Sequence, residues 1–381
     1  MANRIVLNET SYHGAGAIKE IANEVKVRGF AKAFVCSDPD LIKFGVTKKV
    51  TDVLDEAGLA YEIYSNIKPN PTIENVQTGV AAFKASGADY IIAIGGGTII
   101  DIAKAMAVGS ESGDMDELYR AMPELRKNCE LIIVPTTCGT GSEMTNVAVF
   151  NRTRMGTKMG LVSEAMYADK AVLIPELLDS LPFSVFATSS IDALVHAVES
   201  CLSPKATIYT RTFGYQAIDM ILSGYQKLTV SGPESRNALM EDFLIASNFA
   251  GISFGTAGCA AVHAMAYPLG GMYHVPHGES NYAIFTGVMK NYMEMNSGGE
   301  LTVMYRRLAG LLHCSESRAF DCLEDLLNKV LPKKRLREYG VSRADLGEFS
   351  RSVIETQGRL MANSYVPLDF DRVLKIYTEL Y

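Results

Sequence analysis

The 381-residue sequence predicts an α/β domain built on a parallel sheet, followed by a domain made of helices alone. In the first half, short apolar runs that predict strands alternate with stretches whose apolar residues recur at helical spacing, and this alternation is typical of parallel βαβ units. From about Leu181 the apolar residues recur at helical spacing, and no convincing strand alternation appears. The length also favours two domains, at about 100–200 residues each. We place the boundary near residue 180, around Pro175 and Pro182, and expect an α/β domain over 1–180 and a helical domain over 181–381.

The expected strands of the first half are apolar runs, and the first three are each followed by a helical pattern, whereas Pro135 ends the fourth. These strands are Ala33–Cys36, Tyr61–Ile67, Tyr90–Ile94 and Leu131–Val134, and the helices cover about 47–57, 72–85 and 102–108. The expected helices of the second half are Phe183–Cys201, Tyr209–Leu228, Arg236–Phe254 and Leu301–Leu312. No internal repeat interrupts this order.

The composition is that of a globular protein, with 48% hydrophobic and 21% charged residues and a mean hydropathy of +0.09. A net charge of −7 argues against nucleic acid or an anionic membrane as the main partner, because both attract clustered Lys and Arg. No apolar run reaches the ~18 residues of a membrane span, and the N-terminus lacks the apolar region of a signal peptide. The seven cysteines are scattered without a CxxC pair, so we expect a reducing cytoplasm rather than a disulfide framework or a structural zinc cluster.

A glycine-rich turn follows the strand that ends at Ile94. Gly95, Gly96, Gly97 and Thr98 lead into a helix that carries Asp101, and a helix start behind glycines offers free N–H groups to a phosphate. The pattern GGGTxxD departs from the GxGxxG fingerprint, and a tight turn without a ligand explains it equally well. The segment Pro135–Glu143 also follows a strand and is rich in small and hydroxyl residues, which favours a pyrophosphate site.

Asp38 closes the strand Ala33–Cys36. A carboxylate at a strand end can bond the adenosine ribose hydroxyls and repel a 2′-phosphate, which would favour NAD over NADP. Position alone also fits a solvated turn aspartate before Pro39.

Two histidine-containing segments suggest a metal site. Asp192 and His196 are four residues apart in a helical pattern, so both project from one face. His263 lies in a second apolar helical stretch, and His277 stands between Pro276 and Gly278, where we expect a loop. One carboxylate and three imidazoles suit a divalent metal, although apolar helices also contain histidines that are only hydrogen-bonded in a core.

The remaining histidines, His13, His274 and His313, are assigned no role in the site.

Four long motifs together resemble the iron-containing (group III) alcohol dehydrogenase family. These are Gly95–Asp101 (GGGTIID), Pro135–Glu143 (PTTCGTGSE), Asp192–Glu199 (DALVHAVE) and His263–Gly278 (HAMAYPLGGMYHVPHG). Within the family, the closest resemblance is to the bacterial 4-hydroxybutyrate dehydrogenases. It rests on 248–252, 273–278 and 335–340.

The resemblance implies a dehydroquinate synthase-like fold: a Rossmann-like NAD-binding domain and a helical metal-binding domain, with the active site in the cleft between them. It implies that the metal ligands are Asp192, His196, His263 and His277. The cofactor-binding residues that it implies are Asp38, Asn70, Gly96, Gly97, Thr98, Asp101, Thr136, Thr137, Thr140 and Lys158. The metal is usually Fe²⁺ in this family, and the ligand set also suits Zn²⁺. Homodimers or larger homo-oligomers are common in the family.

Tyr267 departs from the family pattern. Many members have a histidine there, four residues after the ligand at His263, and it lies near the nicotinamide. A tyrosine with an ordinary pKa of about 10 is no general acid or base near neutrality. We therefore assign Tyr267 no catalytic role, and no other catalytic residue is assigned.

The expected reaction is hydride transfer between NAD(H) and a primary alcohol or aldehyde, with 4-hydroxybutyrate and succinate semialdehyde as the expected pair. A bound cation would act as a Lewis acid on the substrate oxygen. Diols or simple primary alcohols are the alternative substrates, and a free carboxylate would need a cation such as Arg152, Arg154 or Lys205. A lyase similar to dehydroquinate synthase is a rival from another class, and a non-enzymatic metal or nucleotide binder is a third.

Overall fold

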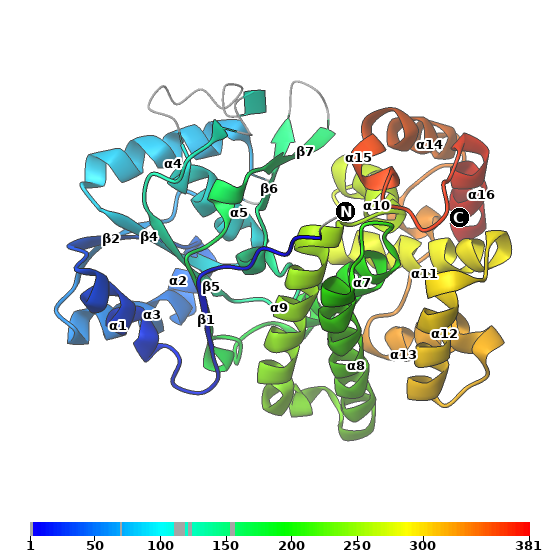
Figure 1. The fold of residues 1–381 in the computed structure, drawn as a ribbon, viewed down its shortest axis with the longest axis horizontal. Helices are drawn as coiled ribbons and strands as arrows, with labels where there is room; N and C mark the ends of the chain where they lie inside the picture. Colours follow the sequence, from blue (N-terminus) through cyan, green and yellow to red (C-terminus); the bar gives the residue numbers. More distant parts are fainter. Residues whose placement is uncertain (1–2, 69–70, 110–118, 121–123, 153–156) are drawn as a thin grey trace. The chain divides into compact units, whose positions relative to one another are not determined.

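The computed structural model describes residues 3–68, 71–109, 119–120, 124–152 and 157–381 (Figure 1). They form two compact units. One spans Val6–Leu181, and the other spans Pro182–Tyr381 together with the first five residues of the chain.

The first unit is built on a six-stranded parallel sheet with the order β1-β8-β5-β4-β2-β3. The strands are β1 (Thr10–His13), β2 (Lys32–Cys36), β3 (Ala60–Tyr64), β4 (Tyr90–Gly95), β5 (Glu130–Pro135) and β8 (Lys170–Leu173). Every residue of β4 is buried, as expected for a central strand covered on both faces. The predicted α/β fold with a parallel sheet is confirmed.

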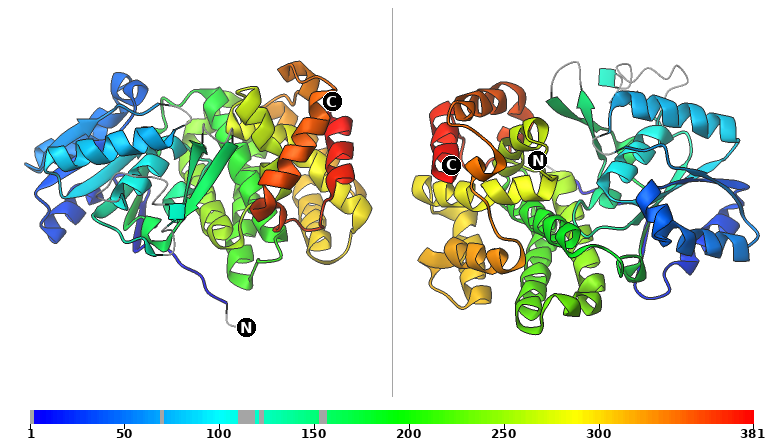
Figure 2. Two further views of the ribbon diagram at one scale, coloured as in Figure 1. Left: turned by 90° about the horizontal axis from the view of Figure 1, so that it is seen from above. Right: turned by 180° about the vertical axis from the view of Figure 1, so that it is seen from behind.

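Helices cover both faces of this sheet (Figures 1 and 2). The helices are α1 (Lys19–Arg28), α2 (Pro39–Lys43), α3 (Val46–Glu56), α4 (Ile73–Ser86) and α5 (Gly97–Ala107). On one side α1 packs on α3, and on the other α4 packs on α5. The helix that we expected from Ile102 begins five residues earlier, because the glycine-rich turn already forms its first turn.

The sequence patterns missed four strands. The short edge strands β1 and β8 pair with each other, although about 160 residues separate them in the chain. An antiparallel hairpin of β6 (Val147–Arg152) and β7 (Thr157–Val162) stands apart from the main sheet. The expected strand from Tyr61 stops at Tyr64 rather than Ile67.

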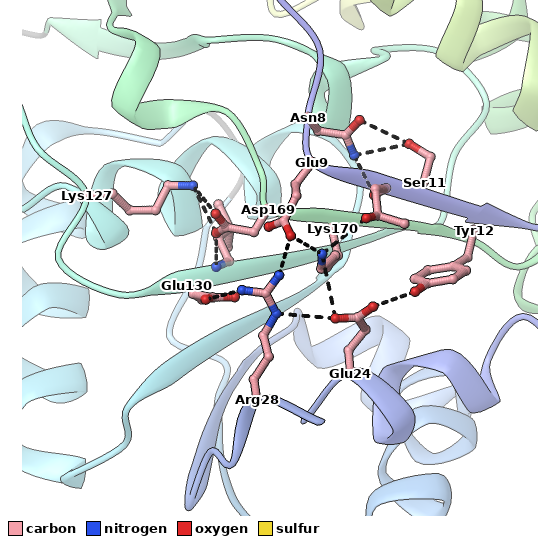
Figure 3. A network of polar contacts seen from close by, with 12 residues as sticks. Asn8, Glu9, Ser11, Tyr12, Glu24, Arg28, Lys127, Glu130, Asp169 and Lys170 are labelled. Atoms are coloured by element: carbon pink, nitrogen blue, oxygen red, sulfur yellow. Dashed lines mark hydrogen bonds and ion pairs between the residues drawn. The ribbon is translucent and has the colours of Figure 1, made fainter. Parts of the chain in front are cut away.

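A charged network joins the beginnings of β1, β5 and β8 to α1 (Figure 3). Lys170 is only 3% exposed, and its Nζ lies 2.9 Å from Glu9 Oε1 and 3.6 Å from Glu24 Oε2. Arg28 contacts both of these carboxylates and also Glu130. The buried ammonium is therefore paired, which lowers the cost of its desolvation. This network lies at the amino ends of the strands, so the carboxyl ends are left for ligands.

The second unit consists of helices, and three of them pack around α7 (Phe183–Leu202). These three are α8 (Ile208–Ser231), α9 (Met240–Ala257) and α11 (His277–Met295). The other helices are α10 (Ala261–Met272), α12 (Gly299–Leu312), α13 (Ala319–Val330), α14 (Asp345–Thr356), α15 (Gly358–Met361) and α16 (Phe370–Leu380). The residues that we expected to open α9, from Arg236, form a 3₁₀ segment over Pro233–Leu239, a frequent geometry at helix starts. The predicted helical character of this half is confirmed.

Two parts of this unit are long and apolar enough for a membrane span. One is α7, and the other is the bent pair Pro233–Ala257 and Ala261–Met272, whose halves meet at 105°. In α7, 83% of the apolar window is buried inside the fold, as in the core helix of a helical domain.

Candidate metal centre and cofactor loops

Helix α7 presents an aspartate and a histidine on one face. Asp192 and His196 are one turn apart, and His196 Nδ1 lies 4.0 Å from Asp192 Oδ2. Both side chains are buried, at 3% and 5% exposure. The expected i,i+4 pair therefore points into the helical core rather than into solvent.

Two further histidines come from the first turns of α10 and α11. His263 Nε2 lies 3.7 Å from Asp192 Oδ1, and His277 Nε2 lies 3.8 Å from the same oxygen. The ligand atoms of the four residues, His196 included, are all within 4.8 Å of one another. The structure thus brings together the four residues singled out in the sequence.

His277 is the first residue of α11, with Pro276 at its N-cap, so the expectation that it lies on a loop is wrong. Pro276 has an extended ψ of 142°, as is usual for an N-cap residue, so the helical path begins at His277. Gly278 lets this helix start approach α7 closely, since a Cβ there would lie 2.0 Å from the Thr188 carbonyl oxygen.

Glu199 orients the His263 ring. Its Oε2 lies 2.6 Å from His263 Nδ1, and its two oxygens accept backbone N–H groups of Ala260 (3.0 Å) and Val262 (2.6 Å). A carboxylate at Nδ1 keeps the ring proton there and leaves the Nε2 lone pair free for a cation. Sequence reasoning assigned Glu199 no role, although it stands seven residues after Asp192, on the same helix face.

Asn281 and Phe254 hold the other ligands in place. The Asn281 Nδ2 donates to Asp192 Oδ1 (2.6 Å) and lies 3.3 Å from His277 Nε2. The Phe254 ring stacks on His196 with centroids 4.2 Å apart. Asn281 follows His277 by one helical turn, a spacing that would have identified it as a neighbour.

The cluster fits a divalent cation. His263 Nε2 is buried and has no hydrogen-bond partner among the described residues, which is costly unless a ligand takes its lone pair. One carboxylate and three imidazoles match the donors of Fe²⁺ and Zn²⁺. Burial alone would raise the pKa of Asp192, but the nearby imidazoles, with His196 first, hold it below its ordinary value. The carboxylate is therefore in its metal-binding form. The His277 side chain is 41% exposed, so the cluster is open on that side.

The predicted cofactor segments meet at the carboxyl edge of the sheet. The chain moves outward from β2 to β3 in one direction and from β4 to β5 in the other, so the strand order reverses between β2 and β4. Ligands of open α/β sheets bind at such a switch point. Asp38 follows β2, Gly96 follows β4, and Thr136 follows β5 at this edge.

The two small-residue segments pack directly on each other. A Cβ on Gly96 would lie 3.4 Å from Thr137 Cγ2, and one on Gly97 would lie 2.9 Å from Thr140 Cγ2. Gly96 is the N-cap of α5, so the free N–H groups of that helix start face the same space. A side chain at Gly97 would therefore clash with Thr140, whereas one at Gly96 would meet Thr137 at ordinary van der Waals distance.

The other predicted cofactor residues have distinct surroundings. Asp38 caps α2 by accepting the Leu41 N–H (2.8 Å) with one oxygen. Asp101 uses both oxygens within the protein, accepting from Ser142 Oγ and from the Val149 N–H, each at 2.9 Å. It therefore shapes the loop around the proposed cofactor site. Thr98 lies in the first turn of α5, Lys158 belongs to β7, and Asn70 lies outside the described residues.

The buried Lys104, to which the sequence assigned no role, stabilises the chain around Ser142. Lys104 Nζ donates to Ser142 Oγ (2.9 Å), Thr145 Oγ1 (3.0 Å) and the Val147 carbonyl (3.0 Å). Burial lowers its pKa to about 8, against the opposing effect of Asp101. It ties α5 to the chain after the second small-residue segment.

Comparison with known proteins identifies the family. Residues 8–175 match iron-containing alcohol dehydrogenase, and residues 186–381 match the C-terminal region of the Fe-containing alcohol dehydrogenase family. The chain belongs to the iron-containing alcohol dehydrogenase family. It is thus an oxidoreductase of the type that couples NAD(H) to alcohol or aldehyde substrates and holds a divalent metal, typically Fe²⁺.

Curated relatives of this alcohol dehydrogenase include two bacterial enzymes. The 4-hydroxybutyrate dehydrogenase of Clostridium kluyveri is 49% identical over 291 residues, which cover 76% of this chain and 78% of that protein. The lactaldehyde reductase of Escherichia coli K12 is 33% identical and covers 93% of this chain and 94% of that enzyme.

Solved structures share the fold over its whole length. A 1,3-propanediol oxidoreductase superimposes with a TM-score of 0.91 at 26% identity, covering 100% of both chains. The sulfoacetaldehyde reductase of Bifidobacterium kashiwanohense, solved with NAD⁺, has a TM-score of 0.87 at 22% identity and covers 100% of this chain and 99% of its own.

Proposed function

We propose that this iron-type alcohol dehydrogenase interconverts 4-hydroxybutyrate and succinate semialdehyde with NAD(H). The observation that supports this substrate assignment is the 49% identity to the Clostridium kluyveri 4-hydroxybutyrate dehydrogenase over three quarters of the chain. The candidate metal cluster and the glycine-rich loops would supply the parts that hydride transfer between an alcohol and a nicotinamide requires.

Asp192, His196, His263 and His277 would hold the metal, which acts as a Lewis acid on the substrate oxygen when bound. Glu199 contacts His263 Nδ1 and so leaves Nε2 as the ring atom that would bind the metal. Asn281 holds Asp192 and His277 in one orientation. Burial of three of the four ligands excludes water from most of the cluster, which strengthens every charge interaction there.

The proposed NAD site uses the carboxyl edge of the sheet. The helix start at Gly96–Thr98 would bind the pyrophosphate, with Thr136, Thr137 and Thr140 as hydroxyl donors beside it. Asp38 has one carboxylate oxygen beyond the one that caps α2, and this oxygen would meet the adenosine ribose and disfavour a 2′-phosphate. Asn70, Asp101 and Lys158 complete the proposed set on the strength of the family motif.

Diols are the second candidate substrates, because the lactaldehyde reductase and the 1,3-propanediol oxidoreductase act on short polar alcohols or aldehydes by their names. NADH absorbance with the metal-loaded enzyme decides between them. We expect 4-hydroxybutyrate to give a higher kcat/KM than 1,4-butanediol or 1-butanol. Activity on diols without activity on 4-hydroxybutyrate would overturn the substrate assignment, and NADH formation from any alcohol excludes the lyase.

A variant tests the metal assignment separately. His263→Ala should abolish turnover and lower the bound metal while leaving NAD binding measurable, because the two sites use different residues. Near-normal turnover in this variant would contradict the ligand set.

We also propose that the enzyme works in the reducing cytoplasm as a homodimer or larger homo-oligomer. The seven cysteines are free thiols, and four of them are buried. Sedimentation of the metal-loaded enzyme tests the oligomeric state.

A further inference from the structure

Lys104 is a fully buried lysine on α5, three residues after Asp101. Its ammonium group has three N–H donors and no acceptor, and three acceptors surround it. These are Ser142 Oγ (2.9 Å), Thr145 Oγ1 (3.0 Å) and the Val147 carbonyl (3.0 Å). A cation that has left water depends on such hydrogen bonds, and bonds from a charged donor are strong. Lys104 therefore fixes the positions of the groups that accept from it.

The hydrogen bond from Lys104 sets the direction of the next one. Because an ammonium group only donates, Ser142 Oγ accepts from Lys104 and donates its own proton to Asp101 Oδ1 (2.9 Å). The Ser142 hydroxyl thus lies between a positive and a negative charge, and two charge-assisted hydrogen bonds hold it in one orientation. Ser142 is only 6% exposed, so water competes little for these bonds.

Ser142 also contacts Thr140, one of the proposed cofactor residues. The Ser142 N–H donates to Thr140 Oγ1 (3.3 Å). A hydroxyl has one proton and two lone pairs, so an oxygen that accepts from Ser142 still has its own proton to donate. The methyl group of Thr140 packs against Gly97, the first residue of α5, where an added Cβ would lie 2.9 Å from Thr140 Cγ2. Thr140 is therefore held on two sides beside the start of α5, with its hydroxyl as a donor.

Lys104 has a structural role as well. Its bond to the Val147 carbonyl fastens β6 to α5, and so does the bond from the Val149 N–H to Asp101 Oδ2 (2.9 Å). These two elements pack on each other within the first unit (Figure 1). Removal of the lysine should therefore lower the stability of this unit, in addition to any effect on a ligand.

We propose that Lys104 is a positioning residue for NAD(H), which acts through Ser142 to keep the Thr140 hydroxyl as a hydrogen-bond donor to the pyrophosphate of the cofactor. This inference rests on the proposed function, because Thr140 belongs to the proposed NAD site. A pyrophosphate offers acceptors, so the donated hydroxyl would add to the free N–H groups at the start of α5. Lys104 itself is buried and would not touch the cofactor.

The test measures the Kd of NADH by fluorescence titration of the metal-loaded enzyme in the absence of substrate. Lys104→Met should raise this Kd about 10-fold, which corresponds to one weakened hydrogen bond to a charged group, while kcat at saturating NAD changes little. Lys170→Met is the matched control. Lys170 is also buried and ion-paired in the same unit, but it lies at the amino edge of the sheet, so its removal should leave the Kd of NADH at the wild-type value.

A double-mutant cycle shows whether Lys104 acts through Thr140. Thr140→Val keeps the methyl group that packs on Gly97 and removes the hydroxyl, so it should raise the Kd about 10- to 100-fold. Lys104→Met should then add little to Thr140→Val, because both changes act on the same hydrogen bond. Ser142→Ala leaves the other two bonds of the ammonium group in place and should also raise the Kd, so it provides the same test if Lys104→Met does not fold.

Three results would overturn the positioning role. They are an unchanged Kd in Lys104→Met and Ser142→Ala, losses that multiply in the double variant, and an equal rise of the Kd in Lys170→Met. The proposed substrate is judged separately, because NADH binding is measured without it. A wild-type enzyme that shows these variant effects on NADH but does not oxidise 4-hydroxybutyrate overturns the proposed substrate and keeps the role of Lys104.

Discussion

Glu199→Gln isolates the contribution of a side chain that contacts the proposed metal ligand His263. The substitution keeps the size of the side chain and its burial at 1% exposure. It removes the charge and replaces one acceptor oxygen by an amide nitrogen. Glu199 has three donors to satisfy, namely the N–H groups of Ala260 and Val262 and the His263 ring, and a glutamine oxygen cannot serve all of them.

The free-energy cost of Glu199→Gln depends on the orientation of the glutamine side-chain amide. If the glutamine oxygen accepts from Val262, its NH₂ group faces His263 Nδ1 and forces the ring proton onto Nε2, the atom that would bind the metal. If the oxygen stays at His263, the NH₂ group faces the Val262 N–H. Either way at least one charge-assisted hydrogen bond is lost, about 1.5–3 kcal/mol, and metal affinity should fall roughly 10–100-fold.

The assay is elemental analysis of Fe²⁺ and Zn²⁺ after equilibration against a graded chelator series. Glu300→Gln is the matched control, because Glu300 accepts from Tyr215 (2.6 Å) and pairs with Arg211 (3.1 Å) in the same unit, and none of these residues belongs to the metal cluster. Wild-type metal affinity in Glu199→Gln, or an equal loss in the control, would refute the tautomer argument.

Three further predictions concern packing, cofactor choice and pH. Gly278→Ala should destabilise the helical unit by about 1–3 kcal/mol in chemical denaturation, because the added Cβ would lie 2.0 Å from a backbone oxygen of α7, whereas Gly310→Ala on α12 meets nothing within 4 Å and should be neutral or slightly stabilising. Asp38→Asn keeps the helix cap but removes the charge, so kcat/KM with NADP relative to NAD should rise; an unchanged ratio contradicts the ribose role. Lys104→Met should change the pH dependence of stability. The folded pKa of Lys104 is about 8 against an ordinary 10.5, so between these values the unfolded chain holds a proton that the folded chain lacks, and wild-type stability should rise with pH relative to the variant. Parallel pH profiles of the two unfolding free energies would contradict this.

The local sequence determined those strands and helices whose apolar periodicity is complete within a few residues. The buried strands β2, β4 and β5 and helices such as α3, α4, α7 and α8 were predictable, because side-chain burial follows the period of each element. The pairing of Asp192 with His196 was predictable for the same reason, since a helix fixes neighbours at i and i+4. The glycine-rich turns identified the edge of the sheet that would bind a phosphate.

Tertiary structure decided what depends on contacts between distant segments. Strands β1 and β8 are short, and their pairing across about 160 residues leaves no local periodic signal. The role of Glu199 arises because the start of α10 meets α7 through hydrogen bonds to this carboxylate, a contact that does not follow from spacing along the chain. Packing between segments that are distant in the chain depends on how well the surfaces of entire helices and strands fit together. The sequence alone therefore singled out the four candidate metal ligands, while the structure brought them together and identified Glu199 as the residue positioned to orient one of them.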